Sequence, residues 1–168
     1  FLIGNIYSQS FSDITVATWE GDLVVAIEVS SVWADVNNDG SLDLIYSGLD
    51  TLGLPISGVY LNSGAPNYTL SRYNLGGIPG LKEAALAAGD VDNDGDIDLL
   101  ISGETFGGSF ITDVYKNDGE GAYASAFTLE GISRGAISLG DLDNDGDLDA
   151  VIAGVSASGV LAEVYLIS

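Results

Sequence analysis

Residues 90–98 read Asp-Val-Asp-Asn-Asp-Gly-Asp-Ile-Asp, and close copies of this nonapeptide occupy residues 35–43 and 141–149. The first copy reads Asp-Val-Asn-Asn-Asp-Gly-Ser-Leu-Asp and the last reads Asp-Leu-Asp-Asn-Asp-Gly-Asp-Leu-Asp. The copies begin roughly 50 residues apart, a spacing typical of repeat architectures. A second marker, a tyrosine preceded by valine or isoleucine, keeps the same period: Tyr7, Tyr60, Tyr115 and Tyr165. Two markers with one period indicate an internal repeat.

Each repeat divides into four predicted strands around its acidic nonapeptide. Small residues precede the nonapeptide, as at 84–89, and the apolar run that follows it is typical of a buried strand. The Val-Tyr segment forms a third strand, which ends in hairpin signals such as Asn-Ser-Gly, and alternating stretches at 68–73 and 123–129 form a fourth. The Ala-rich piece at 81–88 is assigned to a strand by its place in the repeat. Four strands in about 50 residues predict an all-β array of about three propeller-type blades.

The charge balance of the 168-residue chain restricts its partners. Asp and Glu number 25 against 4 Lys and Arg, which gives a net charge of −21. Such a surface repels phosphate backbones and anionic lipids and attracts cations, so nucleic acid is excluded as a partner. No apolar run approaches the roughly 20 residues that span a bilayer, which argues against membrane insertion. The chain has neither Cys nor His, so thiolate and imidazole metal sites and Ser-His or Cys-His nucleophiles are excluded too.

The acidic nonapeptides have the composition of cation-binding loops. Up to five carboxylates in nine residues repel one another, and a counter-cation relieves that repulsion. The chain turns at the glycine in position 6. Side chains 1, 3 and 5, the carbonyl of position 7 and the carboxylate of position 9 then form an oxygen cage suited to Ca²⁺, and less well to Mg²⁺. An EF-hand is excluded, because its position 12 requires Glu and here holds Tyr46, Ile101 or Ile152. Three loops in register disfavour the alternative that they are merely acidic turns.

The nonapeptide and the Val-Tyr-x-Asn-x-Gly marker after it resemble the FG-GAP/VCBS repeat of integrin-type β-propellers, over nearly the whole chain. The resemblance implies one Ca²⁺ in each of the three loops and an extracellular or cell-surface protein. The ligands it implies by position are Asp35, Asn37, Asp39, Ser41 (carbonyl) and Asp43 in the first loop, Asp90, Asp92, Asp94, Asp96 (carbonyl) and Asp98 in the second, and Asp141, Asp143, Asp145, Asp147 (carbonyl) and Asp149 in the third. The first loop should bind most weakly, because Asn37 and Ser41 replace two carboxylates.

The array departs from that family in its number of blades. Its expected divisions, within one domain, are a partial blade over 1–26, repeats over 27–80 and 81–133, and a partial repeat over 134–168. A closed ring needs roughly four or more blades, and an open arc leaves strand edges unpaired. Three outcomes remain open: a fragment of a larger secreted propeller, a ring closed by two copies, or a filament. In the filament, N-terminal strands at 6–20 of one subunit complete the last blade of the next.

These observations predict a Ca²⁺-binding extracellular repeat protein with a structural or adhesive role, and not an enzyme. The expected partners are further copies of the chain, in an oligomer or filament, and a glycan or other cell-surface molecule. A lectin-like module is the alternative, while an enzyme on a propeller scaffold is disfavoured by the lack of His and the scarcity of Lys and Arg. Asn67 begins an Asn-Tyr-Thr glycosylation sequon, and Trp19 and Trp33 are expected in the core.

Overall fold

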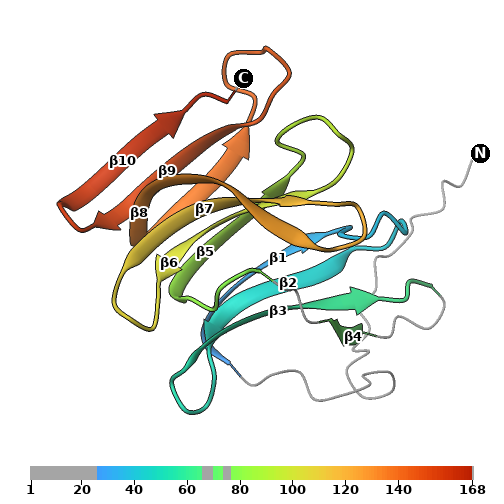
Figure 1. Ribbon diagram of the computed structural model, residues 1–168, viewed down its shortest axis with the longest axis horizontal. Coiled ribbons are helices and arrows are strands. Elements are labelled where there is room, and N and C mark those ends of the chain that lie inside the picture. Colours follow the sequence, from blue (N-terminus) through green and yellow to red (C-terminus); the bar gives the residue numbers. More distant parts are fainter. Residues whose placement is uncertain (1–25, 66–69, 74–76, 168) are drawn as a thin grey trace, which may run out of the picture.

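The computed structural model describes residues 26–65, 70–73 and 77–167, and every regular element within them is a β-strand (Figure 1). The strands are β1 (Ile27–Ala34), β2 (Asp43–Leu49), β3 (Pro55–Asn62), β4 (Leu70–Tyr73), β5 (Lys82–Gly89), β6 (Asp98–Glu104), β7 (Phe110–Asn117), β8 (Tyr123–Gly140), β9 (Asp149–Ser156) and β10 (Gly159–Tyr165). The predicted all-β class is confirmed for these residues, and the Ala-rich piece at 81–88 is the strand β5. None of them forms a helix that could cross a bilayer. The expectations for residues 6–20, Trp19 and Asn67 lie outside the described residues.

The strands pair antiparallel throughout and form two sheets. The first sheet has the order β1-β2-β3-β4, and the second, which is strongly curled, has the order β10-β9-β8-β7-β6-β5 (Figure 1). Within each sheet, strands that follow one another in the chain are therefore neighbours, as in a meander. Three segments repeat one pattern of strands, and we refer to residues 27–73 as the first unit, 82–130 as the second unit and 132–165 as the third unit.

The strand β8 differs from the expected division into separate four-stranded blades. It runs unbroken from Tyr123 to Gly140, and it pairs with β7 through its first half and with β9 through its second half. Between β4 and β5 the chain contains Gly77, Pro79 and Gly80, which interrupt extended structure. β8 contains no proline, and it continues through Gly131 and Gly135 from the second unit into the third without a turn.

Each contact between neighbouring units buries an apolar cluster. The strand β5 packs against both β1 and β8, so the first strands of the three units lie side by side. The cluster between the first and second units includes Val36, Ile45, Val59, Leu99 and Ile101. The cluster between the second and third units includes Val91, Leu100, Val114 and Ala150. The contacts between units thus supply much of the hydrophobic core.

A β-bulge lies near the start of each first strand. Glu28, Glu83 and Arg134 have φ angles of 54°, 51° and 52°, in the left-handed region, and the strand register shifts beside each of them. Arg134 Nε donates to both carboxylate oxygens of Glu83 at 2.8 Å. This guanidinium, together with Ser133, holds the pKa of Glu83 below its ordinary value. The bulges therefore link the second and third units at the strand ends opposite the acidic loops.

The expectation that Trp33 belongs to the core is wrong. Along β1 the inward positions are Val32 and Ala34, whereas Trp33 is 53% exposed. Strand periodicity places Trp33 on the face of the first unit that points away from the second unit. Its exposure reflects the absence of a preceding unit among the described residues.

Candidate metal sites

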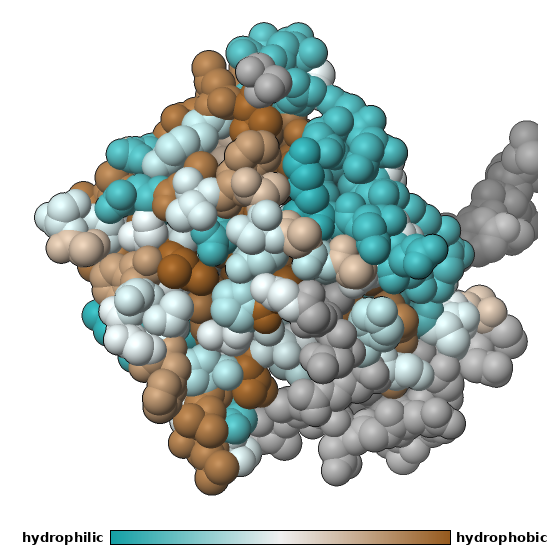
Figure 2. Space-filling view, viewed as in Figure 1, coloured by the Kyte–Doolittle hydropathy of each residue, from teal (hydrophilic) through white to brown (hydrophobic). Residues whose placement is uncertain are grey.

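The three acidic loops, at residues 35–43, 90–98 and 141–149, each join the first and second strands of a unit. They lie along one edge of the molecule, from the top to the right of Figure 1, where Figure 2 shows a hydrophilic band. Position 4 holds Asn38, Asn93 or Asn144, with φ angles of 55°, 57° and 61°. Asparagine tolerates this left-handed conformation better than most residues, so the repeated Asn-Asp-Gly sequence gives all three loops the same turn.

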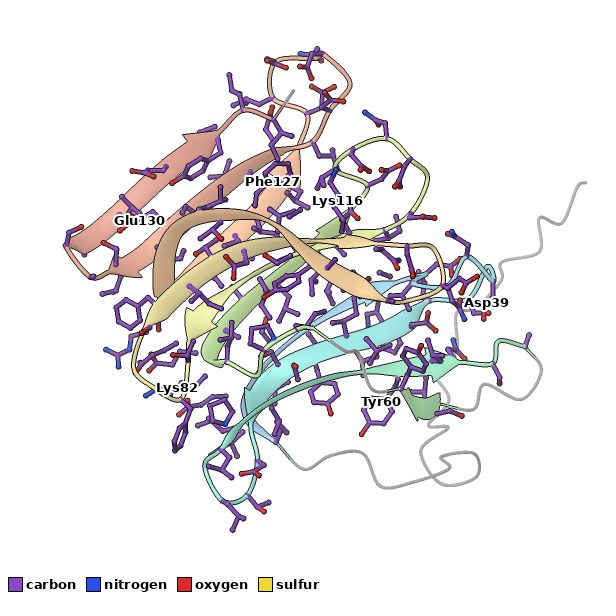
Figure 3. All side chains as sticks on the ribbon, in the orientation of Figure 1. Asp39, Tyr60, Lys82, Lys116, Phe127 and Glu130 are labelled. Carbon is purple, nitrogen blue, oxygen red and sulfur yellow. The ribbon has the colours of Figure 1, made fainter. Side chains whose placement is uncertain are left out.

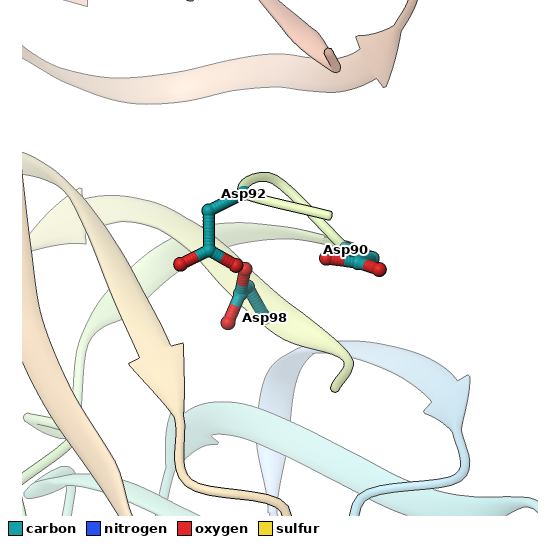
Figure 4. A group of neighbouring side chains, drawn as sticks. All are labelled: Asp90, Asp92 and Asp98. Carbon is teal, nitrogen blue, oxygen red and sulfur yellow. The ribbon is translucent and has the colours of Figure 1, made fainter. Parts of the chain in front are cut away.

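Three carboxylates converge in the second loop and again in the third. Asp90, Asp92 and Asp98, at positions 1, 3 and 9, each offer an oxygen within 4.8 Å of the others (Figure 4). The corresponding residues of the third loop form the same arrangement: Asp141, Asp143 and Asp149. An all-oxygen donor set at this spacing fits a hard cation such as Ca²⁺. In the first loop, position 3 is Asn37, which offers an amide oxygen in place of a carboxylate.

The aspartate at position 9 is fixed by two backbone hydrogen bonds. Asp98 is fully buried, and its carboxylate accepts the N–H of Val91 and the N–H of Asn117, both at 2.9 Å. The other two loops repeat this arrangement: Val36 and Asn62 donate to Asp43, and Leu142 and Ile167 donate to Asp149. Position 9 therefore joins the start of its loop to the end of the third strand.

The pKa of position 9 shifts in different directions in the three units. Burial raises the pKa of Asp43 and of Asp98, although the donated N–H bonds oppose this effect. In the third loop the N–H bonds from Ile167 and Leu142 outweigh burial and lower the pKa of Asp149. The difference follows the position of the units, since a neighbouring unit covers the first two loops on a side that is open in the third.

Positions 1 and 5 shape the backbone of the loop. Asp90 accepts the N–H of Asp94 at 3.1 Å and of Gly95 at 2.9 Å, and Asp94 accepts the N–H of Asp96 at 2.9 Å. Asp35 and Asp39 make the equivalent bonds in the first loop, and Asp145 does so in the third. Position 5 lies outside the group of three carboxylates, and its role as a ligand stays a prediction.

The side chain at position 7 joins adjacent loops. Asn38 Nδ2 donates to Asp96 Oδ1 at 2.6 Å, and Asn93 Nδ2 donates to the side chain of Asp147 and, at 3.2 Å, to the carbonyl of Gly146. The asparagine at position 4 of one loop therefore contacts position 7 of the next loop. The side chain of position 7 is therefore hydrogen-bonded to the preceding loop, whereas the atom predicted to bind the metal is the backbone carbonyl of the same residue.

A positively charged side chain of β7 contacts the second loop. Lys116 Nζ lies 2.6 Å from Asp92 Oδ2 and 5.7 Å from the centroid of the Phe127 ring (Figure 3). The hydrogen bond from Lys116 lowers the pKa of Asp92 and raises that of Lys116. The positions equivalent to Lys116 hold Leu61 and Leu166, so this ion pair is particular to the second loop. A metal ion there would share Asp92 with the ammonium group.

Sequence reasoning missed the asparagine of the Val-Tyr-x-Asn-x-Gly marker as part of the site. Asn62 and Asn117 donate their backbone N–H to position 9 and their side-chain amide to the carbonyl of position 8. Asn117 Nδ2 also donates to the Val36 carbonyl of the first unit at 2.8 Å. The signal was present in the sequence, since this asparagine occupies the same position in the first and second units, 55 residues apart (117 − 62).

Comparison with known families identifies part of the chain as a repeat. A family model described as an FG-GAP-like repeat matches residues 35–101, which extend from the first acidic loop into β6. The curated proteins include no match to the chain. The matched segment contains the first and second acidic loops and the Val-Tyr marker between them. The chain therefore carries a repeat of the FG-GAP-type family over residues 35–101, as its sequence motifs predict.

Proposed function

We propose that the chain is a non-enzymatic, Ca²⁺-binding repeat protein of the β-propeller type, with a structural or adhesive role outside the cell. The observation that carries the proposal is the convergence of three carboxylates in each of two loops. Hard cations prefer such oxygen donors, and the FG-GAP-like match supports a propeller-type repeat. The lack of His and the scarcity of basic residues leave few groups for catalysis.

Positions 1, 3 and 9 would hold the cation, and Ca²⁺ would supply the positive charge that offsets their mutual repulsion. Position 9 is bonded to the backbone of two other segments, so binding in the loop would also stabilise the strand framework. The first loop would bind most weakly, since Asn37 takes the place of a carboxylate. The second loop would bind less tightly than the third, because Lys116 competes for Asp92.

The arrangement of strands supports the proposal that each unit is a blade. The first strands β1, β5 and β8 lie side by side, as the inner strands of adjacent blades would. Within the described residues β10 pairs only with β9, whereas its counterparts β3 and β7 each have two partners. We propose that another copy supplies the fourth strand of the third unit from residues 6–20, which gives an oligomer or filament.

Calorimetric titration and thermal melts test the metal proposal. Ca²⁺ should bind with measurable heat. A concentration one hundred times Kd should stabilise the fold by about 2.7 kcal/mol per site, which corresponds to a Tm increase of roughly 5–10 °C. Mg²⁺ should act more weakly at the same concentration. Absence of binding heat, together with a melt that excess chelator leaves unchanged, would refute the proposal.

A glycan-binding role is the second candidate, and one crevice favours it. The crevice has a volume of about 520 Å³, lies between the second and third units, and is lined by Phe127, Tyr165, Val114 and Leu129 among others. Aromatic rings in a concave apolar site are suited to a small organic ligand. Specific signals on a glycan array that disappear in the Phe127→Ala variant would support this role.

A further inference from the structure

The third unit exposes an apolar face that is buried in the first two units. Leu142, Val151 and Val164 are 59%, 42% and 53% exposed. Their counterparts by position are at most 1% exposed: Val36, Ile45 and Val59 in the first unit, and Val91, Leu100 and Val114 in the second. In those units the next unit covers the face. We call Leu142, Val151 and Val164 the trailing face.

The first unit exposes the complementary face. Val29, Trp33 and Leu42 are 47%, 53% and 57% exposed. The counterparts of these residues in the second unit pack against the cluster between the first and second units: Ala84, Ala88 and Ile97. The third unit repeats this arrangement, with Leu139 and Leu148 packed against the next cluster. We call Val29, Trp33 and Leu42 the leading face.

The acidic loops show the same asymmetry in their polar contacts. Asn38 reaches Asp96 in the next loop, and Asn93 reaches Asp147 in the loop after that. Asn144 holds the same left-handed conformation, with a φ of 61°, at the end of this series. At the other end Ser41 occupies position 7 of the first loop, so that a preceding asparagine would meet a hydroxyl group.

We propose that the trailing face of one copy binds the leading face of a second copy, with Asn144 directed at Ser41 of that copy. The interface would repeat the contacts that already join units within the chain, with an apolar centre and an asparagine link at the loop edge. The inference rests on the proposed propeller-type repeat and deepens it, because it names the partner and the residues that meet.

A second copy of this chain is the occupant that the two faces specify. The trailing and leading faces are different surfaces, so one copy can bind a partner through each of them. Such head-to-tail binding is heterologous, and it continues unless the rotation between copies closes a ring. The high net charge of −21 opposes association, so we expect assembly to increase with salt and with Ca²⁺.

Sedimentation velocity of the full chain in Ca²⁺ and about 0.15 M salt tests the proposal. The wild type should form species larger than dimers as the concentration rises through the micromolar range. Val164→Glu on the trailing face and Trp33→Glu on the leading face should each weaken association about a hundredfold or more, because a carboxylate would be buried in the contact. Phe106→Glu is the matched control, since Phe106 is 77% exposed and lies on neither face.

Mixing the two face variants gives the decisive result. Each variant keeps one intact face, so an equimolar mixture should form dimers and nothing larger. A wild type that stays monomeric, or face variants that assemble as the wild type does, would overturn the proposal. Ca²⁺ titration of the same samples keeps the two proposals separate, since binding heat without assembly contradicts only the interface. If Val164→Glu does not fold, Leu142→Glu tests the same face from a loop.

Discussion

Replacing Asp98 separates the structural role of position 9 from its proposed role as a metal ligand. The buried carboxylate accepts two backbone N–H groups at 2.9 Å, from Val91 and Asn117. Asp98→Ala leaves both donors without a partner, and an orphaned buried donor costs about 1–3 kcal/mol. The substitution also removes the cost of burying the carboxylate, which raises the pKa of Asp98, and this gain offsets part of the lost stability. We expect a net loss of about 3 kcal/mol in chelator, or a Tm lower by roughly 6–12 °C.

Urea unfolding and thermal melts of three variants, each in chelator and in Ca²⁺, provide the measurement. Asp98→Asn keeps one acceptor and should lose about half as much stability as Asp98→Ala in chelator. Asp92→Asn is the control, because the strongest partner of Asp92 is the half-exposed Lys116, so the change should cost less than about 1 kcal/mol. All three variants should reduce the stabilisation by Ca²⁺. If Asp98→Ala matches Asp92→Asn in chelator, the hydrogen bonds to position 9 do not hold the fold.

Three further changes test other parts of the structure. Lys116→Leu removes the competing ammonium group, so Ca²⁺ affinity in calorimetric titration should rise several-fold, and an unchanged affinity would contradict this reasoning. Gly131→Ala places a β-carbon 2.2 Å from the Phe110 carbonyl oxygen and should lower the free energy of unfolding in urea by about 2 kcal/mol. Gly140→Ala is the control, since its β-carbon meets nothing within 4 Å and the change should be neutral. Equal effects of the two substitutions would contradict the close approach of Gly131 to Phe110. Burial raises the pKa of Tyr115 to about 12, so the neutral phenol contributes stability that is complete below pH 10.0 and is lost as the pH rises through about 12. Tyrosinate absorbance of wild type and Tyr115→Phe should differ by one late ionisation step, and a step near pH 10.0 would show that Tyr115 is exposed.

The strands and loops within each unit could be predicted from the sequence, because the same motifs recur in every repeat. The Ala-rich piece that became β5 has little intrinsic preference for a strand, yet its position before an acidic loop identified it correctly. The structure also brings positions 1, 3 and 9 together, while the oxygen cage around a cation stays a prediction. Position 5 lies outside this group and accepts the N–H of position 7, an arrangement that composition alone does not reveal.

Features that depend on contacts between neighbouring units could not be predicted from the sequence. The exposure of Trp33 depends on which unit lies beside β1, whereas its hydrophobicity alone suggests burial. The hydrogen bonds of position 9 join segments on different strands, so they require the folded register. β8 continues through Gly131, which approaches β7 closely, and this continuity is visible only in the structure.

The unbroken course of β8 has a mechanical consequence. The same strand is hydrogen-bonded to β7 along one half and to β9 along the other, so tension carried along it loads many bonds at once in shear. The second and third units should therefore resist stretching together and open as one cooperative body. The first unit is attached through the Gly77–Gly80 link, where no shared strand transmits the load. Under a pulling force we expect the protein to lengthen first at this link.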